Sequence, residues 1–171
     1  MKISYLISGI IIAGLVACGK QAPQLPANKF VPDNSKAETL LTINESLIQR
    51  EDSLLEIYVK KSGKPFSKHE LGFWYLIDKK GTGKKVIKDV DCNIRYQLSL
   101  ISGEEVDNGI QTLKPGKKES TNGLEEFLQI LHHGDSATVI LPWYLAYGMQ
   151  GSQSPPVPSY TSVIYSVEVL N

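Results

Sequence analysis

The chain has 171 residues with 18 basic and 18 acidic side chains, so its formal net charge is zero. A neutral chain without a basic stripe does not fit nucleic acid as a partner. The length suits one globular domain with attachments, and no internal repeat is visible.

The N-terminus has the pattern of an export signal. Lys2 precedes an apolar run, residues 3–16, which is too short to span a bilayer comfortably. The run ends in Leu15-Val16-Ala17-Cys18, which resembles a bacterial lipobox, whose cysteine is lipidated and becomes the mature N-terminus. We therefore expect residues 1–17 to be a lipoprotein signal peptide and Cys18 to anchor the protein to a membrane through acyl chains. An ordinary signal peptide with an incidental cysteine is the alternative.

The residues after the lipobox bear on location and redox state. Residue 19 is glycine rather than Asp, and the usual sorting rule for lipoproteins then predicts the outer membrane, with the domain facing the periplasm. Once Cys18 is lipidated, Cys92 is the only remaining thiol, so no intramolecular disulfide can form. Cys92 lies in an apolar segment and is predicted to be a small buried hydrophobic residue.

A tether and a helical segment follow. Residues 18–34 contain the lipidated cysteine and a flexible, proline-containing tether. Residues 35–66 begin with a capping box from Ser35 to Glu38 and continue as a helix to about Lys61. Its apolar stripe is Leu40, Ile43, Leu47, Leu54, Ile57 and Tyr58. We expect this amphipathic helix to pack on the domain, which favours a monomer, but the heptad-like spacing leaves a dimerising helix open.

The remaining residues, 67–171, combine strands with one short helix. Strands are predicted where apolar and polar residues alternate, at Phe73–Asp78, Val90–Leu100, Ala137–Leu141 and Val163–Leu170. A helix beginning at Thr121 or Asn122 has Leu124, Phe127, Leu128 and Leu131 on one face, His132 and His133 in its last turn, and Gly134 as its C-cap. This pattern predicts an α+β fold, in which one antiparallel sheet packs its apolar face against one amphipathic helix.

Conventional catalytic patterns do not stand out, and tyrosines do. His132 and His133 are adjacent and diverge on a helix, no cysteine or histidine spacing fits a zinc site, and there is no G-x-S-x-G elbow, so we expect neither metal nor cofactor. Tyr96, Tyr147 and Tyr165 lie on strands or at a strand end. They could be core residues with hydroxyls at the rim, or they could line a pocket and supply its polar groups.

Three segments carry a resemblance to a known family. Residues 70–108 resemble the opening strand, G-x-G turn and V-x-Y strand of FKBP-type peptidyl-prolyl isomerases. Residues 123–148, with "GLEEFL" and "ILPWYLAYG", resemble their G-W/L-E-E helix and I-P-P-E-L-A-Y-G segment, and residues 157–170 resemble their closing strand. The resemblance implies a curved antiparallel sheet wrapped on one short helix. With the lipobox and the N-terminal helix, the chain is also similar to the gliding-motility-associated isomerase lipoproteins of the Bacteroidetes.

The resemblance also implies a site. It places the catalytic role on Tyr96, Asp107, Tyr147 and Tyr165, and substrate binding on Val106, Thr121, Leu124 and Val157. Leu124 stands where many members have a tryptophan floor, Val106 replaces a phenylalanine, and Tyr165 adds a hydroxyl to a wall. A smaller, less aromatic floor is expected to hold proline less tightly and to reduce the catalytic rate.

The implied function is a prolyl isomerase that assists the folding of exported proteins. Its partners would be proline-containing polypeptides and, weakly, the macrolide-type ligands of the family. An apolar pocket favours the twisted amide over the charge-separated planar one without acid, base or metal. The alternative is an isomerase-like module that binds chains with little or no turnover, either alone or as part of a membrane-associated complex. Trp143 and Tyr144 are expected to widen an exposed apolar rim for these chains.

Overall fold

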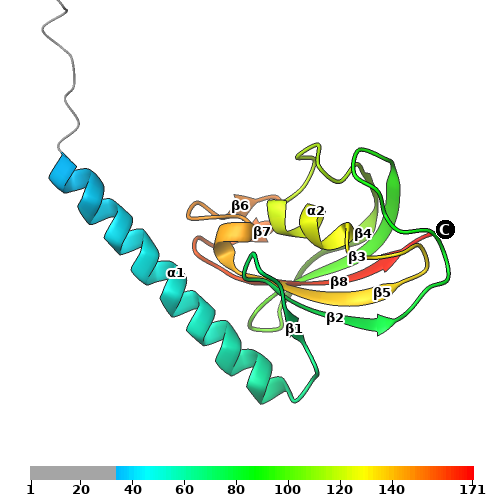
Figure 1. The fold of residues 1–171 in the computed structure, drawn as a ribbon, viewed down its shortest axis with the longest axis horizontal. Coiled ribbons are helices and arrows are strands. Elements are labelled where there is room, and N and C mark those ends of the chain that lie inside the picture. Colours follow the sequence, from blue (N-terminus) through cyan, green and yellow to red (C-terminus); the bar gives the residue numbers. More distant parts are fainter. Residues whose placement is uncertain (1–33) are drawn as a thin grey trace, which may run out of the picture. The chain divides into compact units, whose positions relative to one another are not determined.

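The computed structural model describes residues 34–171, with side chains from residue 38 onward. The predicted signal peptide, Cys18 and the tether up to residue 33 lie outside the described residues, so they stay predictions. The helices and strands follow one another as Figure 1 shows: α1 (Asn34–Ser62), β1 (Ser67–Lys68), β2 (Trp74–Lys79), β3 (Cys92–Leu100), β4 (Glu105–Leu113), α2 (Asn122–Leu128), β5 (Ser136–Leu141), the 3-10 helix η1 (Trp143–Leu145), β6 (Ser152–Gln153), β7 (Pro156–Val157) and β8 (Val163–Val169). None of the helices in this part of the chain has the length and apolar character that crossing a membrane requires.

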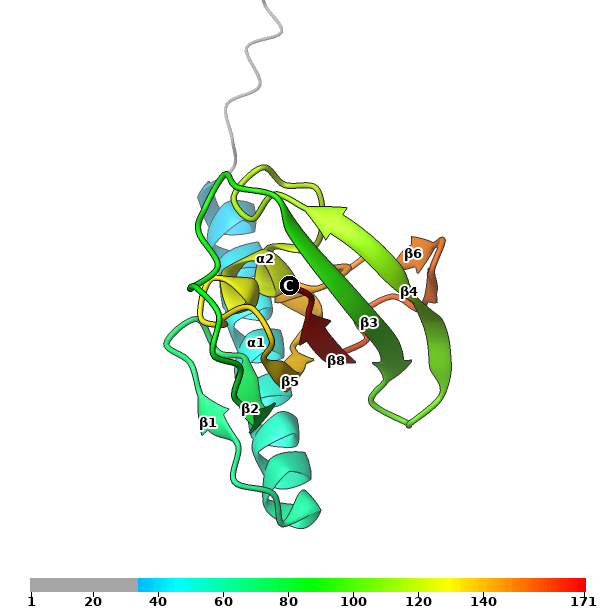
Figure 2. The ribbon, with the colours of Figure 1, turned by 90° about the vertical axis from the view of Figure 1, so that its right-hand side faces the viewer.

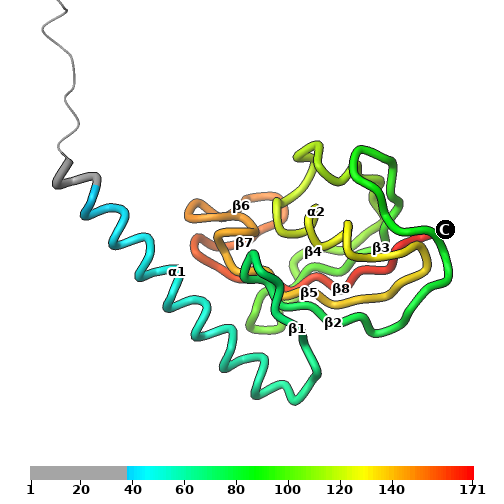
Figure 3. The backbone as a smooth tube through the Cα atoms, viewed as in Figure 1, coloured from blue at the N-terminus to red at the C-terminus, as the bar shows by residue number. Residues whose placement is uncertain are grey.

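The main sheet has six strands in the order β1-β2-β5-β8-β3-β4, and every neighbouring pair is antiparallel. Figure 3 shows how β8, from the end of the chain, runs between β5 and β3. Strands β6 and β7 form a separate two-stranded sheet. The predicted α+β fold, an antiparallel sheet with one short helix against it, is confirmed.

The inner face of the sheet packs on α2. Strand β3 alternates as predicted, because Cys92, Ile94 and Leu98 are buried while the residues between them are exposed or half-buried. Helix α2 contributes three fully buried side chains, and Figure 2 shows this helix within the curve of the sheet. The inner core also contains Cys92 as a free buried thiol, as predicted. Burial of each large apolar side chain contributes about 1.5–3 kcal/mol, so α2 and the sheet stabilise each other.

The outer face of the sheet is partly covered by the C-terminal half of α1. Leu55 and Val59 of α1 form a second buried cluster with Ile140 of β5. Half-buried side chains surround this cluster: Tyr58, Phe66, Trp74, Ile101 and Ile164. Each strand thus sends alternate side chains to the two sides, as Val139 and Leu141 pack into the inner core while Ile140 meets α1. Residues Thr39–Asn171 form one unit, and the contacts described below lie within it.

The prediction that α1 packs on the domain is confirmed, but most of the predicted stripe is exposed. Leu40, Ile43, Leu54 and Ile57 are 62%, 48%, 52% and 62% exposed, and of the predicted stripe only Tyr58 packs on the outer cluster. The face that packs contains Leu55 and Val59 instead of Leu54 and Ile57. The prediction failed because Leu54 and Leu55 are adjacent, so the periodic pattern fits either face. The alternative that the exposed stripe pairs with a second copy stays a prediction.

Two other boundaries differ from expectation. Strand β3 begins at Cys92, so Val90 lies before it and is 52% exposed rather than buried. Helix α2 ends at Leu128, so His132, His133 and Gly134 lie in the connection to β5 and not in a last helical turn. His132 forms an isolated antiparallel bridge with Lys85 instead. Strand β4 was not predicted, because its polar and glycine content hides the alternation.

Candidate functional site

A pocket of about 490 Å³ lies between the inner face of the sheet, the start of α2 and the segment after η1. Six predicted site residues line it together: Tyr96, Asp107, Thr121, Leu124, Tyr147 and Tyr165. The other lining residues, none of which the sequence marks as a binding residue, are Gln111, Lys118, Glu119, Ser120, Ala146, Ser154 and Pro155.

Two predicted substrate-binding residues do not line this pocket. Val157 is 3% exposed and belongs to the inner core, and Val106 is half-buried and packs against that core. Both are therefore assigned to the core and not to the pocket lining.

Tyr96 and Asp107 form one hydrogen-bonded pair in the pocket wall. In the β3–β4 ladder Tyr96 lies opposite Gly109, so Asp107 is its diagonal neighbour on the same face. The Tyr96 hydroxyl donates to a carboxylate oxygen of Asp107 over 2.9 Å. Burial, and then the hydrogen bond to the Asp107 carboxylate, raise the pKa of Tyr96 to about 12. Tyr96 is therefore neutral and Asp107 is held in place.

Tyr147 and Tyr165 form the second pair. Their hydroxyl oxygens are 2.8 Å apart. Tyr165 lies on β8 with a buried ring that is 3% exposed, whereas Tyr147 follows η1 and is half-buried at the pocket. Burial raises the pKa of both tyrosines, so both hydroxyls keep their protons at neutral pH and can donate.

The floor of the pocket comes from the start of α2. Leu124 is 2% exposed and supplies the apolar floor. Thr121 is the N-cap of α2, but its hydroxyl makes no capping bond, and this buried atom has no hydrogen-bond partner among the described residues. Gly123 allows α2 to approach η1, since an added Cβ would lie 2.9 Å from the backbone oxygen of Leu145.

Glu125 holds the loop that forms the opposite wall. This side chain is 4% exposed, and its carboxylate accepts backbone N–H bonds from Gly116, Lys118 and Ser120. Burial alone would raise the pKa of Glu125, but the backbone donors outweigh it and hold the pKa below its ordinary value. The carboxylate thus orders the loop that carries the Lys118–Thr121 side of the pocket.

Trp143 and Tyr144 do not form an exposed rim, so that prediction is wrong. Trp143 is 7% exposed and packs edge-on against Tyr144 and Tyr160. The Tyr144 hydroxyl donates to Asp52 of α1 over 2.7 Å. The sequence does not reveal these contacts, because Trp143 packs on other aromatic rings and the partner of Tyr144 belongs to a helix distant in the chain. Exposed apolar side chains nearby in the chain are instead Met149 and Tyr160.

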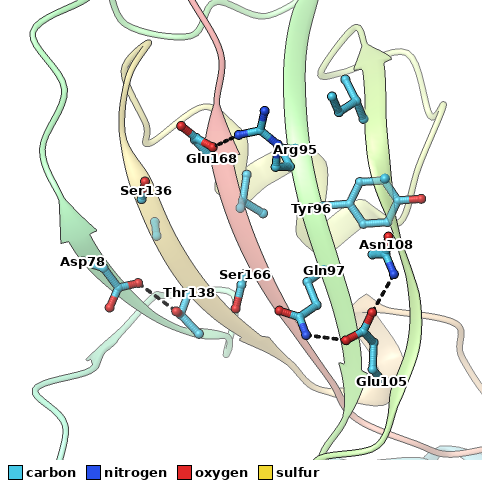
Figure 4. Close-up of a pocket in the computed structure, with 14 residues that line it drawn as sticks. Asp78, Arg95, Tyr96, Gln97, Glu105, Asn108, Ser136, Thr138, Ser166 and Glu168 are labelled. Carbon is cyan, nitrogen blue, oxygen red and sulfur yellow. Dashed lines mark hydrogen bonds and ion pairs between the residues drawn. The ribbon is translucent and has the colours of Figure 1, made fainter.

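A larger hollow, about 630 Å³, lies on the outer face of the sheet (Figure 4). Most of its polar side chains are paired with one another: Arg95 with Glu168, Gln97 and Asn108 with Glu105, and Thr138 with Asp78. The hydroxyls of Ser136 and Ser166 line it as well. This hollow contains only Tyr96 of the predicted site residues, whereas six of them line the inner pocket together. We therefore place the functional site in the smaller inner pocket.

Histidine, cysteine and carboxylate side chains do not gather into a metal site here. Within the part of the chain that the structure describes, no three such residues lie close enough to hold a metal ion.

A curved antiparallel sheet around one short helix, with a tyrosine-lined pocket, defines an FKBP-like domain. Residues 82–170 match the model of the family described as FKBP-type peptidyl-prolyl cis-trans isomerase, and the chain belongs to this family. Over 149 residues it is 30% identical to the FKBP-type peptidyl-prolyl cis-trans isomerase FkpA of Buchnera aphidicola subsp. Schizaphis graminum, covering 84% of this chain and 56% of that protein.

Another relative is similar in sequence, and two solved structures share the fold. The macrophage infectivity potentiator of Trypanosoma cruzi is 29% identical over 96 residues, covering 54% of this chain and 48% of that protein. The crystal structure of FkpA from Escherichia coli superposes with a TM-score of 0.61 at 19% identity, covering 83% of this chain and 73% of that one. A Pseudomonas syringae peptidyl-prolyl isomerase gives 0.62 at 20% identity, covering 74% and 93%. The chain spans about half the length of the curated relatives it matches.

Proposed function

We propose that the protein is a peptidyl-prolyl cis-trans isomerase that acts on proline-containing segments of exported proteins. Membership of the isomerase family supports this activity, and so does a pocket whose walls combine an apolar floor with neutral hydroxyl donors. Isomerisation of X-Pro bonds takes tens to hundreds of seconds (order of magnitude) without a catalyst and can limit folding. A catalyst of this step would serve chains that fold after export.

The proposed mechanism needs no nucleophile and no proton transfer. The barrier to rotation, about 18–20 kcal/mol, comes from resonance that is lost when the amide twists. The pocket has polar walls, but Leu124, Ala146 and Pro155 give it an apolar surface, and contact with such a surface disfavours the charge-separated planar amide more than the twisted one. Catalysis then consists of binding the twisted state more strongly than the planar one.

The observation that carries the proposal is the Tyr147–Tyr165 pair. Because Tyr165 is buried, its proton is best satisfied by the Tyr147 oxygen, 2.8 Å away. Tyr147 then accepts from Tyr165 and keeps its own proton for the substrate carbonyl in the pocket. A chain of two hydroxyls polarises the terminal donor and strengthens its bond to the substrate.

The test is a protease-coupled prolyl peptide assay on the soluble form, residues 19–171. We expect acceleration above the uncatalysed rate that is proportional to protein concentration. Peptide binding without acceleration would contradict the proposal and would favour the alternative function, an isomerase-like module that binds without turnover.

One observation favours that alternative. Leu124 forms a floor smaller than the tryptophan of many family members, so proline is held by fewer contacts. Leu124→Trp should raise the isomerase rate if the smaller floor is what limits it. If the variant binds peptide more tightly and still shows no turnover, the binding module is the better description.

We propose that the protein works as a lipoprotein anchored through Cys18, with its domain facing the periplasm. The proposal rests on the lipobox and on the glycine at residue 19. Radioactive palmitate should label the wild type but not Cys18→Ser. Equal labelling of both would overturn the anchor. The resemblance to gliding-motility isomerases stays a prediction.

A further inference from the structure

We propose that α1 braces the isomerase pocket and that Glu51 and Asp52 are positioning residues for its tyrosines. The inference rests on the proposed function, because it concerns the geometry of the same site. The family match begins at residue 82, so this helix lies outside the matched domain. Two neighbouring carboxylates of α1 nevertheless hold the two segments that carry Tyr147 and Tyr165.

The first contact joins Asp52 to the segment before Tyr147. The hydroxyl of Tyr144 donates to Asp52 over 2.7 Å, between residues 92 positions apart. Gly72 makes room for this contact, since a Cβ added there would lie 2.5 Å from the Tyr144 hydroxyl. Tyr144 is half-buried, and Asp52 is the hydrogen-bond partner that the structure gives its hydroxyl.

The second contact joins Glu51 to the segment before Tyr165. Ser162 is 3% exposed, and its hydroxyl donates to a carboxylate oxygen of Glu51. The backbone N–H of Trp143 donates to the same Ser162 oxygen over 3.0 Å. A hydroxyl has only one proton, so its donation to Glu51 fixes the orientation in which it accepts from Trp143. Glu51 therefore anchors both η1 and the start of β8.

Both anchored residues lie three positions before a pocket tyrosine. Tyr144 precedes Tyr147, and Ser162 precedes Tyr165. Backbone bonds from Gly148 to Trp143 and from Leu145 to Pro142 tie residues 142–148 into one turn. A displacement at the anchored end of this turn is therefore passed on to Tyr147.

The geometry between the tyrosines is sensitive to such a displacement. Their hydroxyl oxygens are 2.8 Å apart, near the optimum for an O–H···O bond, and a shift of about 1 Å would break the bond. We therefore expect the contacts of Asp52 with Tyr144 and of Glu51 with Ser162 to raise kcat by fixing the direction in which the Tyr147 hydroxyl donates its proton. Helix α1 stays attached without the carboxylates, because Leu55 and Val59 are buried against the sheet.

The test is a double-mutant cycle with Asp52→Ala and Tyr144→Phe. We expect each single variant to lower kcat by about 3–10-fold with a smaller change in KM, and the double variant to lose no more than either. Asp52→Asn, which keeps an acceptor oxygen, should recover most of the activity. The matched control is Glu56→Ala, an exposed carboxylate on the same helix that pairs only with Lys60 among the described ion pairs.

Urea unfolding gives the folded fraction of each variant, so that kcat can be expressed per folded molecule. A loss of kcat that remains after this correction indicates a positioning role and not a loss of stability. Unchanged kcat in Asp52→Ala and Tyr144→Phe, with wild type active, would overturn the brace and leave the isomerase proposal intact. NMR tests the brace even without turnover. The ring signals of Tyr147 and Tyr165 should shift in both variants and not in Glu56→Ala, and unshifted signals would also overturn it.

Discussion

Replacing Glu125 by Ala should loosen the pocket wall and lower the free energy of unfolding by about 3 kcal/mol. The carboxylate is 4% exposed and accepts three backbone N–H bonds, at 2.8, 3.1 and 2.9 Å. A hydrogen bond to a charged group contributes about 1.5–3 kcal/mol. Gly116 and Lys118 are exposed, so their N–H groups can turn to water, and we assign about 1 kcal/mol to each bond.

Two variants sharpen this prediction. Glu126→Ala removes an exposed carboxylate from the same helix and should cost less than about 0.5 kcal/mol. Glu125→Gln keeps one acceptor oxygen for the N–H groups of Gly116 and Lys118 but turns an amide toward Ser120, so its cost should be intermediate. The measurement is urea unfolding followed by circular dichroism. If Glu125→Ala lost no more stability than Glu126→Ala, the backbone N–H bonds to the Glu125 carboxylate would not stabilise the fold as proposed.

The same residue gives a pH dependence with a definite sign. Because the folded pKa of Glu125 lies below its ordinary value of 4.5, the carboxylate stabilises the fold above that value. This contribution is lost as the pH falls through the lowered folded pKa, and it should be missing from Glu125→Gln. An acid unfolding curve unchanged by the substitution would contradict the assignment.

Two further predictions concern the pocket. Thr121→Val removes a buried hydroxyl without a partner among the described residues, so it should stabilise the fold by about 1 kcal/mol. The same change should weaken prolyl peptide binding, as measured by calorimetry. Unchanged affinity would mean that the hydroxyl does not contact the ligand. The raised pKa of Tyr96, about 12 against the ordinary 10, predicts stability that is constant below about pH 10 and falls as the pH rises toward 12, and Tyr96→Phe should reduce this fall in alkaline unfolding.

The parts of the fold with strong local periodicity could be predicted from the sequence. Strand β3 and helix α2 each place apolar residues on one face, and their buried residues were identified. Strand β4 was missed because Glu105–Leu113 mixes glycine and polar side chains with few apolar ones. The buried face of α1 was misjudged because Leu54 and Leu55 are adjacent and the pattern suits both.

The sequence predicts the part of the site that consists of tyrosines within recognisable motifs, and it does not predict the rest. The pocket tyrosines follow from the motifs that surround them. The wall at Lys118–Ser120 carries no such signal, since its position depends on the buried carboxylate of Glu125. The contact between Asp52 and Tyr144 joins residues 92 positions apart, and a local sequence pattern cannot predict a contact over that separation.

The most direct test of the account compares kcat/KM for prolyl peptide isomerisation in wild type, Tyr147→Phe and Tyr165→Phe. Phenylalanine keeps the ring, so each variant removes only a hydroxyl. We expect the first variant to lose about 3–10-fold, as one hydrogen bond to the substrate carbonyl contributes about 0.5–1.5 kcal/mol, and the second to lose less. Full activity in Tyr147→Phe, or a wild type no faster than the uncatalysed reaction, would contradict the account.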